Sequence, residues 1–340
     1  MMNALTYLTR GCLRKCTYCA LRDARDVGPE LSIQDWIHAF EILEEMRVEF
    51  NLILGNETWL LGTKLVDLFK NNSIPYALYT TCPPTLFHKY KDRLLGDGII
   101  DNLSCGVDYP ILEESVQDDS YWKSMDAWKG LEYAMKTYPG LDCQGTVTVH
   151  RMNYQYLPQI VNDLAALGVF CGINFIHWDL DGGFDFFPNK DVLSDYLFKD
   201  LDLPRLRKVL DQVLENPQLV QNPEMLKLDT EILTQMGWHC GGNPYGGPTI
   251  DADGSLRVCG YRKGIRTSEF SIFDLPDRVQ DWEMAVFEDA MECPGCCWSY
   301  PFMYHYWMEQ DPKMGQAVFA NHAGRHIPKE TWSKRKGDFL

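Results

Sequence analysis

The sequence predicts an α/β fold, an open and partial (β/α)6 TIM-like barrel followed by a small C-terminal unit. Two observations predict it. Short runs of apolar and β-branched residues alternate with amphipathic stretches through the first half of the chain, and such strand–helix units imply a parallel sheet with right-handed crossovers. There are six of these runs, fewer than the eight strands that close a full barrel. We therefore expect an open barrel whose working face is the end at which its strands finish.

The expected strands are short and rich in apolar residues, and they cover residues 4–9, 50–55, 76–81, 100–108, 143–149 and 169–176. The first helix is the clearest, because Ser32 and Asp35 form a capping pattern and apolar residues from Ile33 to Leu43 recur at helical spacing. Further helical patterns, the last ended by Gly168, cover residues 62–71, 84–95, 121–138 and 156–167.

Three regions are expected along the chain: the barrel over 1–195, a helical connector over 196–235, and a small cysteine-bearing unit with the tail over 236–340. The connector contains a helical segment bounded by prolines. From Met236 the sequence becomes rich in Gly, Pro and Cys, and the stretch DADGS at 251–255 predicts a hairpin.

Length, composition and charge narrow the class of protein. With 340 residues, 45% of them apolar, the chain can fill a sizeable core. No stretch is typical of an export signal or a membrane span, so we expect a cytoplasmic protein with no membrane partner. A net charge of −16 argues against a nucleic-acid partner. Twelve cysteines in a large chain without an export signal indicate metal binding or catalysis more than disulfides.

Three cysteines follow closely on the first expected strand, with the spacing Cys12-x3-Cys16-x2-Cys19. Their loop would lie at the mouth of the barrel, where such folds place their chemistry. A [4Fe–4S] cube has four irons, so three protein thiolates leave one iron with open coordination positions at which a small molecule can bind. Tyr18 adds an aromatic side chain just before the third cysteine. The alternative is a zinc site or a set of buried thiols.

The run CLRKCTYC resembles the signature of the radical S-adenosylmethionine (radical SAM) superfamily. The resemblance implies a reduced [4Fe–4S] cluster held by Cys12, Cys16 and Cys19, whose fourth iron chelates the amino and carboxylate groups of SAM. Transfer of one electron then breaks a C–S bond and gives a 5′-deoxyadenosyl radical that removes a hydrogen atom from the substrate. An external one-electron donor, flavodoxin- or ferredoxin-like, is expected as a partner.

In this family the second strand usually ends in Gly-Gly-Glu-Pro, which holds the SAM amine. Here the stretch is LGNET, so Gly55 and Glu57 match while Asn56 and Thr58 differ. A carboxylate opposite an ammonium suits that role, although an Asn-Glu pair at a strand end is also an ordinary turn.

The ends of the fourth and fifth strands supply contacts to the ribose and adenine of SAM in this family. By position alone, the corresponding residues here are Ser104, Asp108, Thr148, His150 and Asn153. Polar residues at strand ends are also common loop formers or caps, and Asn153 could instead cap the helix that begins near Tyr156.

A second expected site rests on two pairs of cysteines in the C-terminal unit, Cys240 with Cys259 and Cys293 with Cys296. Zinc ribbons pair two closely spaced knuckles, whereas the first pair here has 18 residues between its members. The pattern resembles the SPASM extension of radical SAM enzymes in its shorter, twitch form, which implies one auxiliary [4Fe–4S] cluster for electron transfer or substrate positioning. Cys297 could replace Cys296 as a ligand, or donate a hydrogen atom to a substrate radical.

We therefore expect a radical SAM enzyme, an oxidoreductase or modifying enzyme that acts on a biosynthetic intermediate, either a peptide or a small molecule. The first alternative is a non-catalytic iron–sulfur electron carrier, and the second is a zinc protein that binds nucleic acid. The remaining cysteines of the expected strands are predicted to be small buried hydrophobes, namely Cys82, Cys105, Cys143 and Cys171.

Overall fold

The computed structural model describes residues 2–19, 28–54, 57–96, 98–100, 102–111, 119–178, 191–220, 230, 234, 239 and 247–295. An eight-stranded sheet with the order β6-β5-β4-β3-β2-β1-β7-β8 forms its centre. The first six strands run parallel to one another, which confirms the α/β class and the expected parallel sheet. Their bounds are β1 (Met2–Tyr7), β2 (Val48–Leu54), β3 (Tyr76–Thr80), β4 (Asn102–Gly106), β5 (Asp142–Val149) and β6 (Phe170–Phe175).

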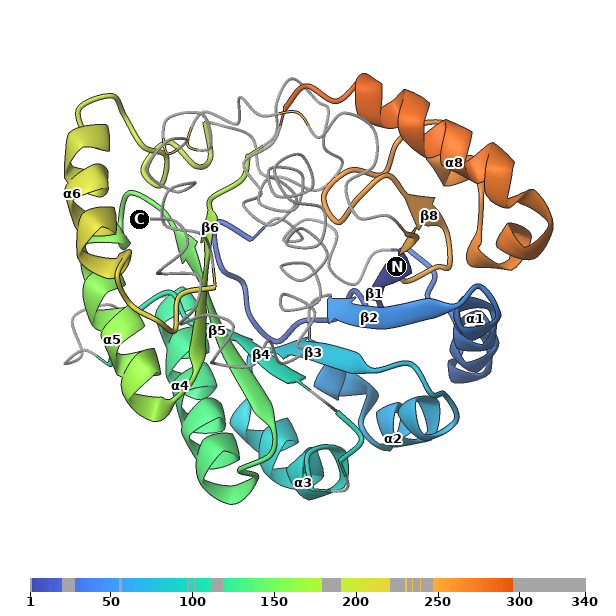
Figure 1. Ribbon diagram of the computed structural model, residues 1–340, viewed down its shortest axis with the longest axis horizontal. Coiled ribbons are helices and arrows are strands. Elements are labelled where there is room, and N and C mark those ends of the chain that lie inside the picture. The colour runs from blue at the N-terminus through green and yellow to red at the C-terminus, as the bar shows by residue number, and fades with distance from the viewer. Residues whose placement is uncertain are drawn as a thin grey trace, which may run out of the picture.

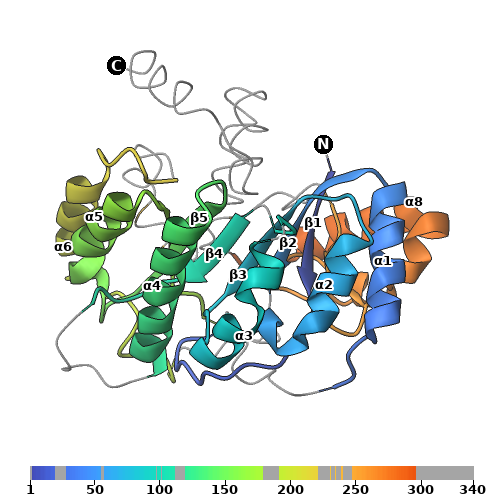
Figure 2. The same cartoon turned by 90° about the horizontal axis from the view of Figure 1, so that it is seen from below.

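Helices cover the outer side of this curved sheet (Figure 1), and Figure 2 shows α1 to α4 following one another along it. The α-helices are α1 (Ile33–Glu45), α2 (Thr63–Lys70), α3 (Pro84–Leu94), α4 (Asp119–Thr137), α5 (Leu157–Leu167), α6 (Leu203–Val213) and α8 (Leu275–Met291). Short 3-10 helices are η1 (Thr58–Leu61), η2 (Tyr154–Tyr156), η3 (Thr267–Glu269) and η4 (Ile272–Asp274). In the described ranges, no helix combines the length and the apolar content that crossing a membrane requires.

Local signals in the sequence explain where two of these helices begin and end. The predicted capping box opens α1, because the Ser32 hydroxyl accepts from the Asp35 amide and the Asp35 carboxylate accepts from the Ser32 amide. The helix α5 ends at Gly168, whose φ of 78° is the left-handed conformation that glycine adopts without steric cost.

The two faces of the six-stranded sheet differ in polarity. A Cβ atom on Gly145 of β5 would lie 2.6 Å from Leu164 of α5, so this residue faces the helices. Its neighbour Thr146 points to the opposite, inner face. There the Thr146 hydroxyl lies 2.8 Å from the Tyr79 hydroxyl of β3 and 3.5 Å from that of Ser104 of β4. The inner face across β3 to β5 is thus lined by neutral hydrogen-bonding groups, unlike the branched apolar side chains that fill a closed barrel.

The C-terminal hairpin extends the sheet beyond β1. The strand β7 (Thr249–Ile250) runs parallel to β1, and β8 (Leu256–Arg257) returns antiparallel to β7. The hairpin predicted at 251–255 is therefore present, and it adds two strands to the β1 edge of the barrel sheet. At the opposite edge, the ring of His177 lies 4.2 Å from that of Tyr261. The segment after β8 thus reaches from one edge of the open barrel to the other.

Candidate active site

The cysteine loop, residues 8–19, leaves β1 at the carboxyl end of the parallel strands and carries all three cysteines of the N-terminal group. Cys16 is buried, whereas Cys12 and Cys19 are partly exposed. The Cys19 amide donates to the Cys16 carbonyl at 3.2 Å, and the Arg14 amide donates to Cys12 Sγ at 3.4 Å. Burial raises the pKa of Cys16 to about 12, and the Lys123 ammonium opposes that rise.

The donor chemistry of the cysteine loop is compatible with an iron–sulfur cluster. Within the described ranges, no group of three or more His, Cys, Asp or Glu side chains has the geometry to hold one metal ion. A four-iron cube spreads its thiolate ligands over different irons, and three thiols on one short loop match that requirement. A metal would also supply the deprotonation that burial denies to Cys16.

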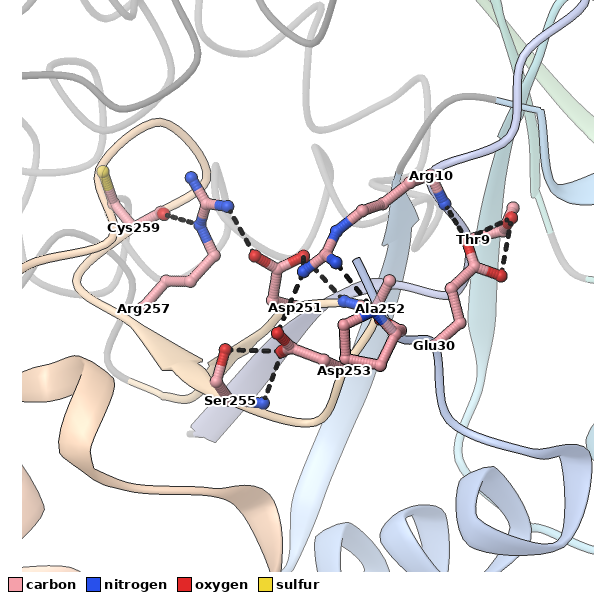
Figure 3. A network of polar contacts seen from close by, with 10 residues as sticks. Thr9, Arg10, Glu30, Asp251, Ala252, Asp253, Ser255, Arg257 and Cys259 are labelled. Carbon is pink, nitrogen blue, oxygen red and sulfur yellow. Dashed lines mark hydrogen bonds and ion pairs between the residues drawn. The ribbon is translucent and has the colours of Figure 1, made fainter. Parts of the chain in front are cut away.

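Arg10 anchors the start of the cysteine loop to the C-terminal hairpin (Figure 3). Its guanidinium lies 3.3 Å from the carboxylate of Asp251 and 3.0 Å from that of Asp253. Gly28 makes room for this side chain, since a Cβ there would lie 2.6 Å from Arg10 Nη1, and its φ of 87° also favours glycine. The loop therefore begins from a point fixed by β1 and by the turn between β7 and β8.

The same hairpin brings Cys259 to the inner side of the barrel. Arg257 is 1% exposed and pairs with Asp251 at 3.0 Å, while its Nε donates to the Cys259 carbonyl at 3.4 Å. Tyr7 of β1 donates its hydroxyl to the Gly260 carbonyl at 2.5 Å. Burial raises the pKa of Tyr7, with smaller contributions from Cys259 and from Cys19 of the cysteine loop. Tyr7 is thus within electrostatic reach of both cysteine-bearing segments.

Glu57 follows β2 and is fully buried, with 0% of its surface exposed. Its amide donates to the carbonyl of Gly11, the residue before Cys12, at 2.8 Å. Burial raises the pKa of the Glu57 carboxyl, and only hydrogen bonds from neutral groups oppose this rise. In the part of the chain that the structure describes, no Lys, Arg or His forms an ion pair with it. The carboxylate therefore lies beside the cysteine loop with its charge unmatched by these residues.

Asp108 is the other buried carboxylate at this end of the barrel, just after β4. The Lys123 ammonium of α4 pairs with it, and the Tyr18 hydroxyl donates to it. The Thr148 amide donates to its second oxygen at 2.7 Å. Gly106 leaves space for the lysine, because a Cβ there would lie 2.9 Å from Lys123 Nζ. Unlike Glu57, Asp108 is therefore paired with a cation among the described residues.

The predicted residues at the ends of β4 and β5 lie together around Tyr18 of the cysteine loop. The rings of Tyr18 and His150 are 5.0 Å apart. Asn153 donates to the carbonyls of Asp108 and Thr148 at 3.0 and 2.9 Å, and its own oxygen accepts from the His150 amide at 2.8 Å. The alternative role of Asn153 as a helix cap is wrong, because its side chain makes no capping bond at η2.

The other predicted residues lie away from Tyr18 or outside the residue ranges that the structure describes. Ser104 is deeper on the inner face, beside Thr146. Cys259 and Cys293 are partly exposed, and the four strand-associated cysteines are buried as predicted. The predicted residues outside the described ranges are Gly55, Asn56, Cys240, Cys296 and Cys297.

Several residues of this site were not predicted from the sequence. Some of them stand at positions that a sequence pattern could have indicated, and others do not. Thr80 and Thr81 end the third strand, so the strand-end rule that singled out Ser104 could have found them. Lys123 gave no signal, because a lysine on an amphipathic helix ordinarily faces solvent. Arg10 gave no such signal either, since the carboxylates with which it forms ion pairs lie more than 240 residues later in the chain.

Comparison with known proteins shows that the fold of this chain is similar to that of solved structures. No protein-family model and no curated protein matches the sequence. SuiB of Streptococcus suis bound to S-adenosylmethionine matches with 14% identity and a TM-score of 0.56, over 81% of this chain and 65% of the SuiB chain. SuiB bound to precursor peptide SuiA matches with 12% identity and a TM-score of 0.57, over 81% and 64% of the two chains.

The matched region is slightly less than two thirds of SuiB. A further solved structure, anSMEcpe with bound AdoMet and the Cp18Cys peptide, aligns with 94% of this chain and 99% of its own at 16% identity and a TM-score of 0.47. From the SuiB match, we conclude that this chain shares the α/β barrel fold of SuiB.

Proposed function

We propose that this protein is a radical SAM enzyme that acts on a biosynthetic intermediate, either a peptide or a small molecule. Cys12, Cys16 and Cys19 would hold a [4Fe–4S] cluster, which supplies the electron that cleaves bound SAM and so provides a radical for removing a hydrogen atom from the substrate. The observation that carries the proposal is the hydrogen bond between the Glu57 amide and the Gly11 carbonyl, at 2.8 Å. It joins a buried, unmatched carboxylate to the loop that bears the three thiols.

Electrostatics favour a cationic ligand at Glu57. A carboxylate removed from water is costly unless it is paired, and the described residues offer it only neutral donors. The amino group of SAM would donate hydrogen bonds to this carboxylate, and its bond to the open iron would give that group positive charge. Asp108 is already matched by Lys123, so it can orient a ligand through Tyr18 and Thr148 without needing a cation. SuiB, whose fold this chain shares, has been solved with S-adenosylmethionine bound.

We further propose an auxiliary [4Fe–4S] cluster in a twitch-like region over 236–340, with Cys240, Cys259, Cys293 and Cys296 as its ligands. Its support is the contact of Tyr7 with Gly260, next to Cys259. Such a cluster would exchange electrons with the substrate or position it, and an external one-electron donor would reduce the first cluster. Cys297, as an alternative ligand or hydrogen-atom donor, belongs to the same proposal.

Replacing Cys16 by alanine tests the function directly. We expect the anaerobically reconstituted wild-type protein to be brown, to bind about eight irons per chain if both sites hold cubes, and to release 5′-deoxyadenosine from SAM on reduction. The Cys16→Ala variant should lose this cleavage. Cys143→Ala, which removes a buried thiol of β5 far from the loop, is the matched control and should retain it. Cleavage by Cys16→Ala would contradict the proposal, and a wild-type protein that takes iron without cleaving SAM would be an electron carrier.

The affinity for SAM should depend on pH through Glu57. Burial raises the pKa of this carboxyl above its ordinary value of about 4.5. As the pH falls through that raised pKa, the carboxylate takes a proton and loses its attraction for the SAM amino group, so the dissociation constant of SAM should rise. Equilibrium dialysis between about pH 5 and pH 7 measures this. The Glu57→Gln variant should show a weak affinity that is nearly flat with pH, and an equally flat wild-type profile would exclude Glu57 as the titrating group.

A further inference from the structure

The turn that follows β3 holds both oxygens of Glu57. The Thr80 hydroxyl donates to Oε1 at 2.8 Å, and Thr81 donates to Oε2 through its hydroxyl at 2.7 Å and through its amide at 2.9 Å. The Trp59 amide at the start of η1 adds a bond to Oε1 at 3.2 Å. Three of the four hydrogen bonds thus come from two consecutive residues of a neighbouring strand, which fixes both the plane and the direction of the carboxylate.

The turn is itself held in an uncommon conformation. Cys82 has a φ of 48°, which residues other than glycine rarely adopt. Its amide donates to the Thr80 hydroxyl at 2.9 Å, so that hydroxyl links the turn to Glu57. Backbone strain of this kind persists only where the surroundings enforce it.

Packing around Cys82 holds the backbone in this uncommon conformation. Its sulfur lies 3.5 Å from the sulfur of Cys105 at the end of β4. On the other side, Gly130 of α4 contacts it so closely that a Cβ on Gly130 would lie 2.5 Å from Cys82 Sγ. Both cysteines are buried, and burial raises the pKa of Cys82, so this thiol remains protonated and acts through packing.

We propose that Thr80 and Thr81 are positioning residues that keep the Glu57 carboxylate ionised and directed at the amino group of the ligand. Hydrogen bonds donated to a carboxylate favour its charged form, and three of the four that Glu57 accepts from described groups come from these two residues. This inference rests on the proposed function, because it requires the ligand to bring an amino group to Glu57. It adds that the strained turn at Cys82 exists to place these two donors.

The test compares two ligands, SAM and a SAM analogue that lacks the α-amino group, on the reconstituted full-length protein. Thr81→Val keeps the shape of the side chain but removes one donor to Oε2, and we expect it to weaken SAM binding by roughly 10-fold, as for hydrogen bonds to charged groups. Binding of the deaminated analogue should not change between the wild-type protein and Thr81→Val, since this analogue has no amino group for Glu57 to contact. Thr81→Ser should restore wild-type affinity for SAM. Thr80→Val should repeat the selective loss.

Thr58→Val is the matched control, because its hydroxyl lies one residue from Glu57 but bonds the Tyr79 carbonyl at 3.3 Å and not the carboxylate. It should leave both affinities unchanged. Equal weakening of both ligands in Thr81→Val, or no weakening of SAM, would overturn the positioning role. Failure of the wild-type protein to bind SAM at all would instead overturn the proposed function, so the two failures are distinguishable.

Discussion

Replacing Glu57 by glutamine should weaken SAM binding by about 100-fold to 5,000-fold. Removing one partner of a desolvated ion pair costs about 3–5 kcal/mol, which corresponds to that range of affinity. In the free protein the carboxylate has no ion-pair partner among the described residues, and burial raises its pKa. Glutamine of the same size removes the charge that attracts the ligand, and its amide nitrogen cannot accept hydrogen bonds as the carboxylate oxygens do.

The measurement pairs calorimetric titration of SAM with thermal unfolding of the same variants. Asp289→Asn is the matched control, since Asp289 is also 0% exposed but is paired with Arg266 at 3.0 Å and accepts from Thr267. That substitution should lower stability and leave SAM affinity unchanged. If Glu57→Gln binds SAM like the wild-type protein, the assignment of Glu57 as a ligand-directed charge is wrong.

Replacing Asp251 by asparagine should destabilise the protein by about 3–5 kcal/mol, because it leaves the buried Arg257 guanidinium without this carboxylate. Asp251 accepts contacts from Arg10 and Arg257, and from the Ala252 amide at 2.7 Å. Figure 3 shows the two guanidinium groups on either side of it. The loss should concentrate at the junction between β1 and the hairpin, where the Leu31 amide donates to the Ala252 carbonyl at 2.8 Å.

Urea unfolding measures the total change, and hydrogen exchange locates it. The matched control is Asp281→Asn, which breaks a 3.3 Å pair with Arg278 between side chains that are 66% and 49% exposed. Exposed pairs of this kind contribute little, so this control should be close to wild type. An Asp251→Asn variant as stable as the control, with unchanged exchange at Leu31, would mean that the network in Figure 3 does not fasten the hairpin to the barrel.

Much of the fold could be predicted because its signals are local. Alternation of strand and helix patterns identified the strands β1 to β6, and the Ser32 capping box fixed the start of α1. Strand ends were less predictable. The fourth strand was expected over 100–108 but covers Asn102–Gly106, because the Val107 amide turns to the Thr146 carbonyl and the Asp108 amide turns to the Ser124 hydroxyl.

The site was predictable in part, and the missing part is non-local. Positions at strand ends indicated Glu57 and Asp108, because the carboxyl ends of parallel strands lie at the same end of the barrel. The charged side chains that form ion pairs in this region could not be predicted from their sequence positions. Lys123 reaches Asp108 from a helix through the space that Gly106 leaves, and Arg10 meets Asp251 only because β7 pairs with β1. Both contacts depend on tertiary structure that no local pattern encodes.

Pulsed electron paramagnetic resonance of the reduced protein with SAM labelled in its amino and carboxylate groups tests the central claim most directly. If three thiolates of the cysteine loop leave one iron open, the labelled nitrogen and oxygen should show hyperfine coupling to the cluster, and SAM should shift its spectrum. The account predicts both effects, and Cys259→Ala should preserve them. A reduced cluster whose spectrum does not respond to SAM, and which shows no coupling to either label, would contradict it.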